Sequence, residues 1–148
     1  MRTVCYGYAR ALSFVMFMVL GGLAGQAGAV CAQTDGTGTW YSFAVAGNSA
    51  LGGFDSYVRC KIVLNSLGTV LTTSTCKGRD DVGVYYASVT GGLVKVWPGC
   101  AITGYLILGG ARYTIEYGQM AQSKNIISFA IYQYANPDNL GVLTGVKQ

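Results

Sequence analysis

Apolar and polar side chains alternate with a period of two along most of the chain beyond residue 30. Within residues 127–132, Ile127, Phe129 and Ile131 form one apolar row, and residues 101–108 repeat the pattern. Successive side chains of a strand point to opposite faces, so this spacing predicts strands. No long stretch carries the three-and-four spacing of an amphipathic helix. The pattern therefore predicts an all-β protein.

Glycine and asparagine punctuate the predicted strands, and both residue types favour turns. The expected turns are Asn65–Gly68, Gly91–Gly92, Gly109–Gly110, Ser123–Asn125 and Asn136–Asn139. Connections this short join each strand to the next, so eight or nine strands counted from Trp40 form a meander. A meander hides its apolar face by closing on itself or by folding into two stacked sheets, and closure also removes exposed edges. We predict one domain over residues 30–148, a small antiparallel up-and-down barrel of about eight strands, with a β-sandwich as the alternative.

The first 29 residues have a different pattern. A basic head precedes an uncharged apolar run over residues 11–23, and small residues follow up to Ala29. This arrangement is typical of a secretory signal peptide, cleaved after Ala29 or after Ala32. An uncleaved membrane anchor is an alternative, because the uncharged stretch is just long enough to span; a lipoprotein cut before Cys31 is disfavoured by the valine before it. We predict a secreted or periplasmic protein with no stable membrane span after processing.

The charged residues mainly exclude one class of partner, nucleic acid. Charged residues make up 11% of the chain, and the net charge is +4. Without the leader it falls to about +2, because Arg2 and Arg10 are two of the ten basic residues and all six acidic ones remain. The segment Lys77–Asp81 is expected to be a solvated loop. No cluster of Lys or Arg is evident that could follow phosphates, so nucleic acid is not expected as a partner.

Four cysteines follow the predicted leader, and export favours disulfides. Cys60 and Cys76 flank the turn near Gly68 at nearly equal distances, so pairing between adjacent strands is geometrically sensible. That leaves Cys31 for Cys100, although four cysteines allow three connectivities. Cleavage after Ala32 would leave one thiol over. The chain has no histidine and no Cys-x-x-Cys, so we expect no metal site and no cofactor.

The absence of histidine also bears on catalysis. Without histidine the chain can form neither a Ser-His-Asp triad nor a Cys-His pair, and it lacks the side chain that most often acts as a general base near neutral pH. Asp35, Asp80 and Asp138 lie in turn-like sequence, where carboxylates normally bond to nearby backbone. Glu116, the only glutamate, is expected to share a face and an ion pair with Arg112. We predict a protein that is not an enzyme; a hydrolase built from these carboxylates is the remaining alternative.

One short motif carries a resemblance. The segment Gly36-Thr-Gly-Thr-Trp40 resembles the start of the first strand in lipocalins and avidins, small secreted barrels in which this tryptophan plugs one end. The later tryptophans of avidins are missing, since only Trp97 follows. The resemblance implies a calycin-type barrel. The glycine-rich turns and Cys100-x-Ile-Thr-Gly104 are also similar to uncharacterised exported bacterial β-proteins.

Tyrosine is abundant, with 11 in the chain. Tyr85 and Tyr86 must point to opposite faces, and Tyr132 and Tyr134 lie opposite Phe129, so some rings are expected to be exposed. Two functions follow. One is a binding protein that holds a small apolar or aromatic ligand in the barrel mouth. The other is a structural or surface-interaction protein (adhesion, inhibition or assembly) that meets a protein or carbohydrate surface with a tyrosine-rich face. Candidate ligand-binding residues are Trp40, Tyr86, Trp97, Tyr132 and Tyr134.

Overall fold

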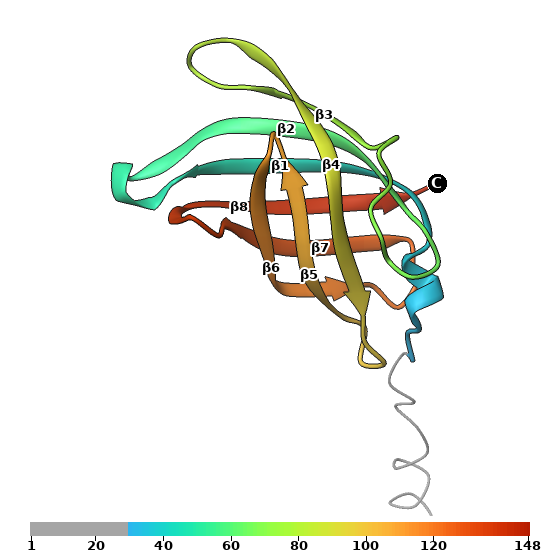
Figure 1. The fold of residues 1–148 in the computed structure, drawn as a ribbon. Helices are drawn as coiled ribbons and strands as arrows, with labels where there is room; N and C mark the ends of the chain where they lie inside the picture. The colour runs from blue at the N-terminus through green and yellow to red at the C-terminus, as the bar shows by residue number, and fades with distance from the viewer. Residues whose placement is uncertain (1–29) are drawn as a thin grey trace, which may run out of the picture.

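A computed structural model describes residues 30–148, which form a closed barrel of eight antiparallel strands (Figure 1). The strands are β1 (Gly38–Asn48), β2 (Gly53–Leu64), β3 (Thr75–Arg79), β4 (Val84–Val96), β5 (Ala101–Leu108), β6 (Ala111–Met120), β7 (Ile126–Gln133) and β8 (Asn136–Lys147). Two short 3-10 turns, η1 (Gln33–Gly36) and η2 (Ser49–Leu51), flank β1. Each strand pairs with its neighbours in the chain, and β8 pairs with β1 to close the wall. The predicted up-and-down barrel is confirmed.

The predicted leader, residues 1–29, lies outside the described residues. Among residues 30–148, no helix has the length and apolar character needed to cross a bilayer.

The alternating rows sort into an inner and an outer face. The apolar rows face inward and form a single core, whose members include Trp40, Ile62, Leu64, Ile102, Leu106, Ile115, Ile127, Phe129 and Leu143. At one end of the barrel, where η1 and the C-terminus lie, the segment between β2 and β3 folds over and bridges to β2 and β4 (Figure 1). This end is here called the closed end. The β1–β2, β3–β4, β5–β6 and β7–β8 connections lie at the other end, which is here called the mouth.

Three predicted turns are present where expected. Gly68 N–H donates to Asn65 O at 2.9 Å, and Gly68 has a φ of 81°. Gly109 and Gly110 have φ values of 57° and 83° and connect β5 to β6. Residues 123–125 lie between β6 and β7. Positive φ is the backbone state that glycine adopts at little cost, which explains the glycines of the first two turns. The third turn has no glycine, and Lys124 itself has a φ of 59°.

Three local predictions were wrong. Gly91–Gly92 does not end a strand, because β4 continues through it with a register shift against β5. A Cβ at Gly92 would lie 2.5 Å from Tyr105 O, so glycine is needed there for close approach and not for a turn. The Asn136–Asn139 segment begins β8, where proline is tolerated near a strand start. Lys77 and Arg79 belong to β3, so the expected loop is largely strand.

Candidate functional site

The closed end holds Trp40, which is 1% exposed. Its indole Nε1–H donates to Gly36 O at 2.8 Å. Lys147 Nζ lies 5.7 Å from the centre of the Trp40 ring and donates to Asp35 O at 2.9 Å. Trp40 is therefore a buried plug at this end of the barrel.

Both predicted disulfides are confirmed. Cys60 and Cys76 are directly paired residues of β2 and β3, with Cα atoms 4.1 Å apart. Cys31 and Cys100 have Cα atoms 5.0 Å apart and tie the start of the described chain to the β4–β5 connection.

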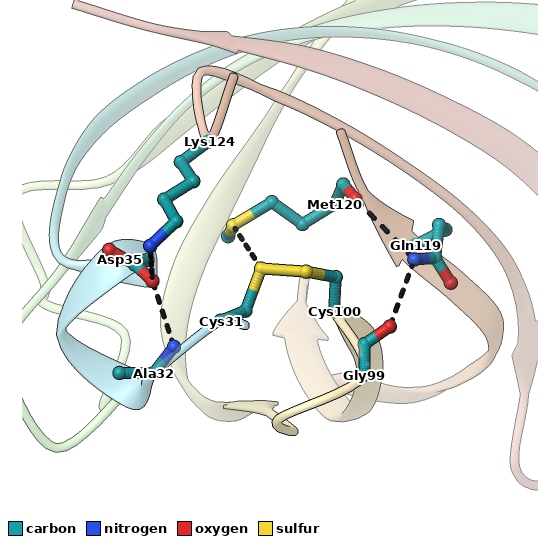
Figure 2. Close-up of a disulfide and its surroundings, with 8 residues drawn as sticks. All are labelled: Cys31, Ala32, Asp35, Gly99, Cys100, Gln119, Met120 and Lys124. Carbon is teal, nitrogen blue, oxygen red and sulfur yellow. Dashed lines mark hydrogen bonds and ion pairs between the residues drawn. A yellow bond between two sulfur atoms is a disulfide. The ribbon is translucent and has the colours of Figure 1, made fainter. Parts of the chain in front are cut away.

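Figure 2 shows the polar contacts around the Cys31–Cys100 bridge. The Asp35 carboxylate accepts a hydrogen bond from Ala32 N–H at 2.8 Å and pairs with Lys124 Nζ at 2.9 Å. The hydrogen bond from Lys124, followed by that from Ala32, lowers the pKa of Asp35 below its ordinary value. These contacts fasten η1 to the β6–β7 turn, so they serve the closed end of the barrel.

The apolar core around Trp40 encloses only a small void. The void among its side chains, bounded by Trp40, Phe129 and Leu143 among others, measures about 10 Å³. That is at the lower limit for a single water molecule. A void of this size does not hold an organic ligand.

The open mouth is polar. A pocket of about 230 Å³ there is lined by residues that include Asn48, Ser56, Tyr113 and Asn139. Asn48 Nδ2 donates to Asn139 Oδ1 at 2.7 Å, and Asn139 Nδ2 donates to Gln133 Oε1 at 2.7 Å. Burial raises the pKa of Tyr113 above its ordinary value, and Tyr85 raises it further. The carboxylate of Asp55 also lines this pocket, so its polar groups are amides, a hydroxyl, a phenol and a carboxylate.

The candidate residues do not converge on one site. Tyr86 is on the outer face of β4 and is 76% exposed, whereas Tyr85 lies against Gly78 on the inner side, as their opposite directions predicted. Trp97 lies at the β4–β5 connection near the closed end, and its Nε1–H donates to Thr103 Oγ1 at 2.8 Å. Tyr132 and Tyr134 lie on and just beyond β7.

The expected pair between Arg112 and Glu116 does not form. The Arg112 guanidinium lies 4.3 Å from the ring centre of Tyr105 and 5.4 Å from that of Tyr134. Tyr134 is 66% exposed. Arg112 and Glu116 share a face of β6, but four residues along a strand span about 13 Å, which is too far for an ion pair.

An outer groove of about 660 Å³ is the site that sequence reasoning missed. Its outward side chains, here called the basic groove, are Tyr41, Arg59, Lys61, Thr75, Lys77 and Tyr86. Register explains the set, because Arg59 pairs with Lys77 across β2 and β3, and Lys77 pairs with Tyr86 across β3 and β4. The signal was available, because Arg59 and Lys61 flank Cys60, Lys77 directly follows Cys76, and the pairing of these two cysteines fixes the register.

The basic groove is electrostatically one-sided. No carboxylate lines it, and within residues 30–148 the only ion pair joins Lys124 to Asp35. Lys77 Nζ lies 5.2 Å from the ring centre of Tyr86. Positive charge and aromatic surface are therefore both presented to solvent without an acidic partner.

Comparisons with known proteins assign no function to this site. No family model matches the chain, and no curated protein does. Among solved structures, the chain is similar to a protein of unknown function of the DUF3598 family from Nostoc punctiforme. That similarity has 15% sequence identity and a TM-score of 0.35, and it covers 80% of this chain and 50% of the other. This chain thus spans half the length of that protein.

Proposed function

We propose that this chain is an exported, non-catalytic binding protein that engages an extended partner through the outer face of its barrel. The observation that carries the proposal is the contrast in available space. The interior void is about 10 Å³, whereas the basic groove outside measures about 660 Å³. Exposed tyrosines give large, rigid contact area with a polar tip, which suits recognition of carbohydrate or protein surfaces.

Export is supported by the disulfides and by the predicted leader. Two bridges are typical of an oxidising compartment. Because Cys31 pairs with Cys100, cleavage after Ala29 keeps the bridge and cleavage after Ala32 destroys it. We therefore favour a secreted or periplasmic protein beginning at Val30, which intact-mass measurement of the exported form would test.

The absence of catalysis is part of the proposal, and the local hydrogen bonds of two aspartates, Asp80 and Asp138, support it. Asp80 Oδ1 accepts hydrogen bonds from Val82 and Gly83 N–H, at 3.0 and 2.9 Å. Asp138 Oδ1 accepts one from Ser49 at 3.1 Å. These carboxylates have local structural partners, as is common for aspartate in turns.

A second candidate function is binding of a small polar ligand in the mouth. The Asn48–Asn139–Gln133 amide chain and the half-buried Tyr113 favour it. An apolar ligand of the calycin type is a weaker fit, because it would leave these polar groups without water.

The test uses two matched tyrosines. Tyr86 and Tyr134 are both exposed and both lie beside a cation, but only Tyr86 lines the basic groove. Binding of wild type, Tyr86→Ser and Tyr134→Ser to a panel of immobilised neutral and acidic polysaccharides and matrix proteins would be measured by interferometry.

We expect at least one polymer to bind wild type, about tenfold less binding by Tyr86→Ser, and unchanged binding by Tyr134→Ser. If an Asn139→Ala change abolishes binding while Tyr86→Ser leaves it unchanged, the mouth is the site and the outer-face proposal is wrong.

A further inference from the structure

We propose that the basic groove binds an acidic polysaccharide, a sugar polymer that carries carboxylates or sulfates. The inference rests on the proposed function, since it takes the outer face as the binding surface. It adds the chemistry of the partner, which follows from the arrangement of cations and rings on β1 to β4.

The cations form a line along the sheet. Three consecutive outward rows contain Lys61 opposite Thr75, Arg59 opposite Lys77, and Arg79 opposite Tyr57. Alternate residues of a strand are about 7 Å apart, so the line of positive charge extends about 13 Å. A polymer with charges repeated along its length can meet these cations together, whereas a single small anion meets one or two.

Aromatic rings border the same line. Tyr41 is paired with Lys61 across β1 and β2, and Tyr86 is paired with Lys77 across β3 and β4. In the central row, Phe43 lies next to Arg59 and stacks on Tyr57 with ring centres 6.3 Å apart. The apolar face of a sugar ring packs against such side chains while its charged substituents reach the neighbouring cations.

Other polyanions fit less well. A lipid bilayer presents a broad surface that cannot follow a groove, while a flexible chain can lie in one. Single-stranded nucleic acid would also combine phosphates with stacked bases, but the two disulfides indicate an oxidising compartment outside the cytosol. Anionic sugar polymers are the partner class that satisfies both the shape and the compartment.

The experiment compares two double variants with the same change in net charge. Arg59→Gln/Lys77→Gln removes the central pair of the groove, and Arg112→Gln/Lys95→Gln removes two exposed cations elsewhere on the barrel. The protein, with both disulfides formed, would be titrated with dextran sulfate, polygalacturonate, neutral dextran, oligodeoxythymidylate and phosphatidylglycerol vesicles. Circular dichroism would confirm that each variant is folded.

We expect wild type to bind dextran sulfate and polygalacturonate, with affinity that falls steeply as salt is raised. The groove variant should lose about tenfold in affinity and the control variant less than about threefold. Equal losses in both variants would mean attraction to net charge alone and would overturn the groove assignment. Tighter binding of oligodeoxythymidylate or vesicles would overturn the partner class.

Two further outcomes separate this inference from the proposed function. If neutral dextran binds as well as dextran sulfate and Tyr86→Ser still weakens binding, the outer face is the binding surface but its partner is not acidic. If the folded protein binds none of the five probes and no polymer of the earlier panel, both proposals fail.

Discussion

Gly78 and Tyr85 occupy neighbouring positions on the inner face of β3 and β4. A Cβ at Gly78 would lie 2.3 Å from Tyr85 Cζ, so the missing side chain makes room for the phenol ring. Because Tyr85 is directed inward, Tyr86 must point outward, where it borders the basic groove. A single glycine on the inside thus helps to set which of two adjacent tyrosines reaches the outer surface.

Among the glycines of residues 30–148, Gly104 leaves the least room for a side chain. Its φ is 134°, and a Cβ would lie 1.9 Å from Leu93 O, a backbone atom that cannot rotate away. We expect Gly104→Ala to lower the free energy of unfolding by about 3 kcal/mol, because backbone strain and a steric clash act together.

Urea denaturation followed by circular dichroism would measure the effect of Gly104→Ala. Gly53→Ala is the control, since nothing lies within 4 Å of its Cβ position, and it should change stability by less than about 0.5 kcal/mol. Equal unfolding midpoints for the two variants would contradict the prediction.

At the scale of elements, the two disulfides close loops of very different length. Cys60 and Cys76 are 16 residues apart and are already brought together by strand pairing. Cys31 and Cys100 are 69 residues apart, and Cys31 precedes the first strand. The chain-entropy argument gives about 3 kcal/mol for the shorter loop and about 4 kcal/mol for the longer.

Cys31→Ala/Cys100→Ala should therefore destabilise the barrel more than Cys60→Ala/Cys76→Ala, by about 1 kcal/mol. Alanine is the better replacement because all four sulfurs belong to buried residues, where a hydroxyl would add its own penalty. Urea unfolding of wild type and both variants would show which bridge contributes more to the free energy of unfolding. A larger loss in the Cys60 and Cys76 variant would show that the cross-strand bridge stabilises the folded state beyond its loop length.

The elements also show what the sequence could and could not predict. Strict alternation identified β5 and β7, because nothing interrupts the period over most of their length. The glycine pair at 91–92 misled, because glycine marks a bulge or a close approach as readily as a turn. Whether a glycine pair forms a turn or a bulge depends on its position along the paired strands and not on the local composition.

Predicting the basic groove from the sequence requires knowing which strands pair, and local composition does not show this. Arg59 and Lys77 are far apart in sequence, and Lys77 was assigned to a loop, so their charges were counted separately. Only the pairing of β2 with β3 makes them neighbours. The cysteine pair predicted that pairing, and extending it by one residue on each side would have predicted the charge cluster as well.

For the whole molecule, closure depends on β8. This strand pairs with β1 along one edge and β7 along the other, and it ends at the closed end, where Lys147 contacts Trp40 and Asp35. An up-and-down barrel distributes its core over all strands, so removal of one strand exposes two edges and one side of the core. Both ends of the described chain lie near the same barrel end (Figure 1).

Removing β8 and moving the chain ends should therefore have opposite results. A chain that stops at Ala135 should lose cooperative thermal unfolding and aggregate, because β1 and β7 become unpaired edges.

A circular permutant should still fold, with residue 148 joined to residue 30 by a Gly/Ser linker and new ends between Gly109 and Gly110. It keeps every strand pair and opens only the exposed β5–β6 turn. Calorimetry and gel filtration would compare the two, and a truncated chain that melts cooperatively as a monomer would contradict the dependence on closure.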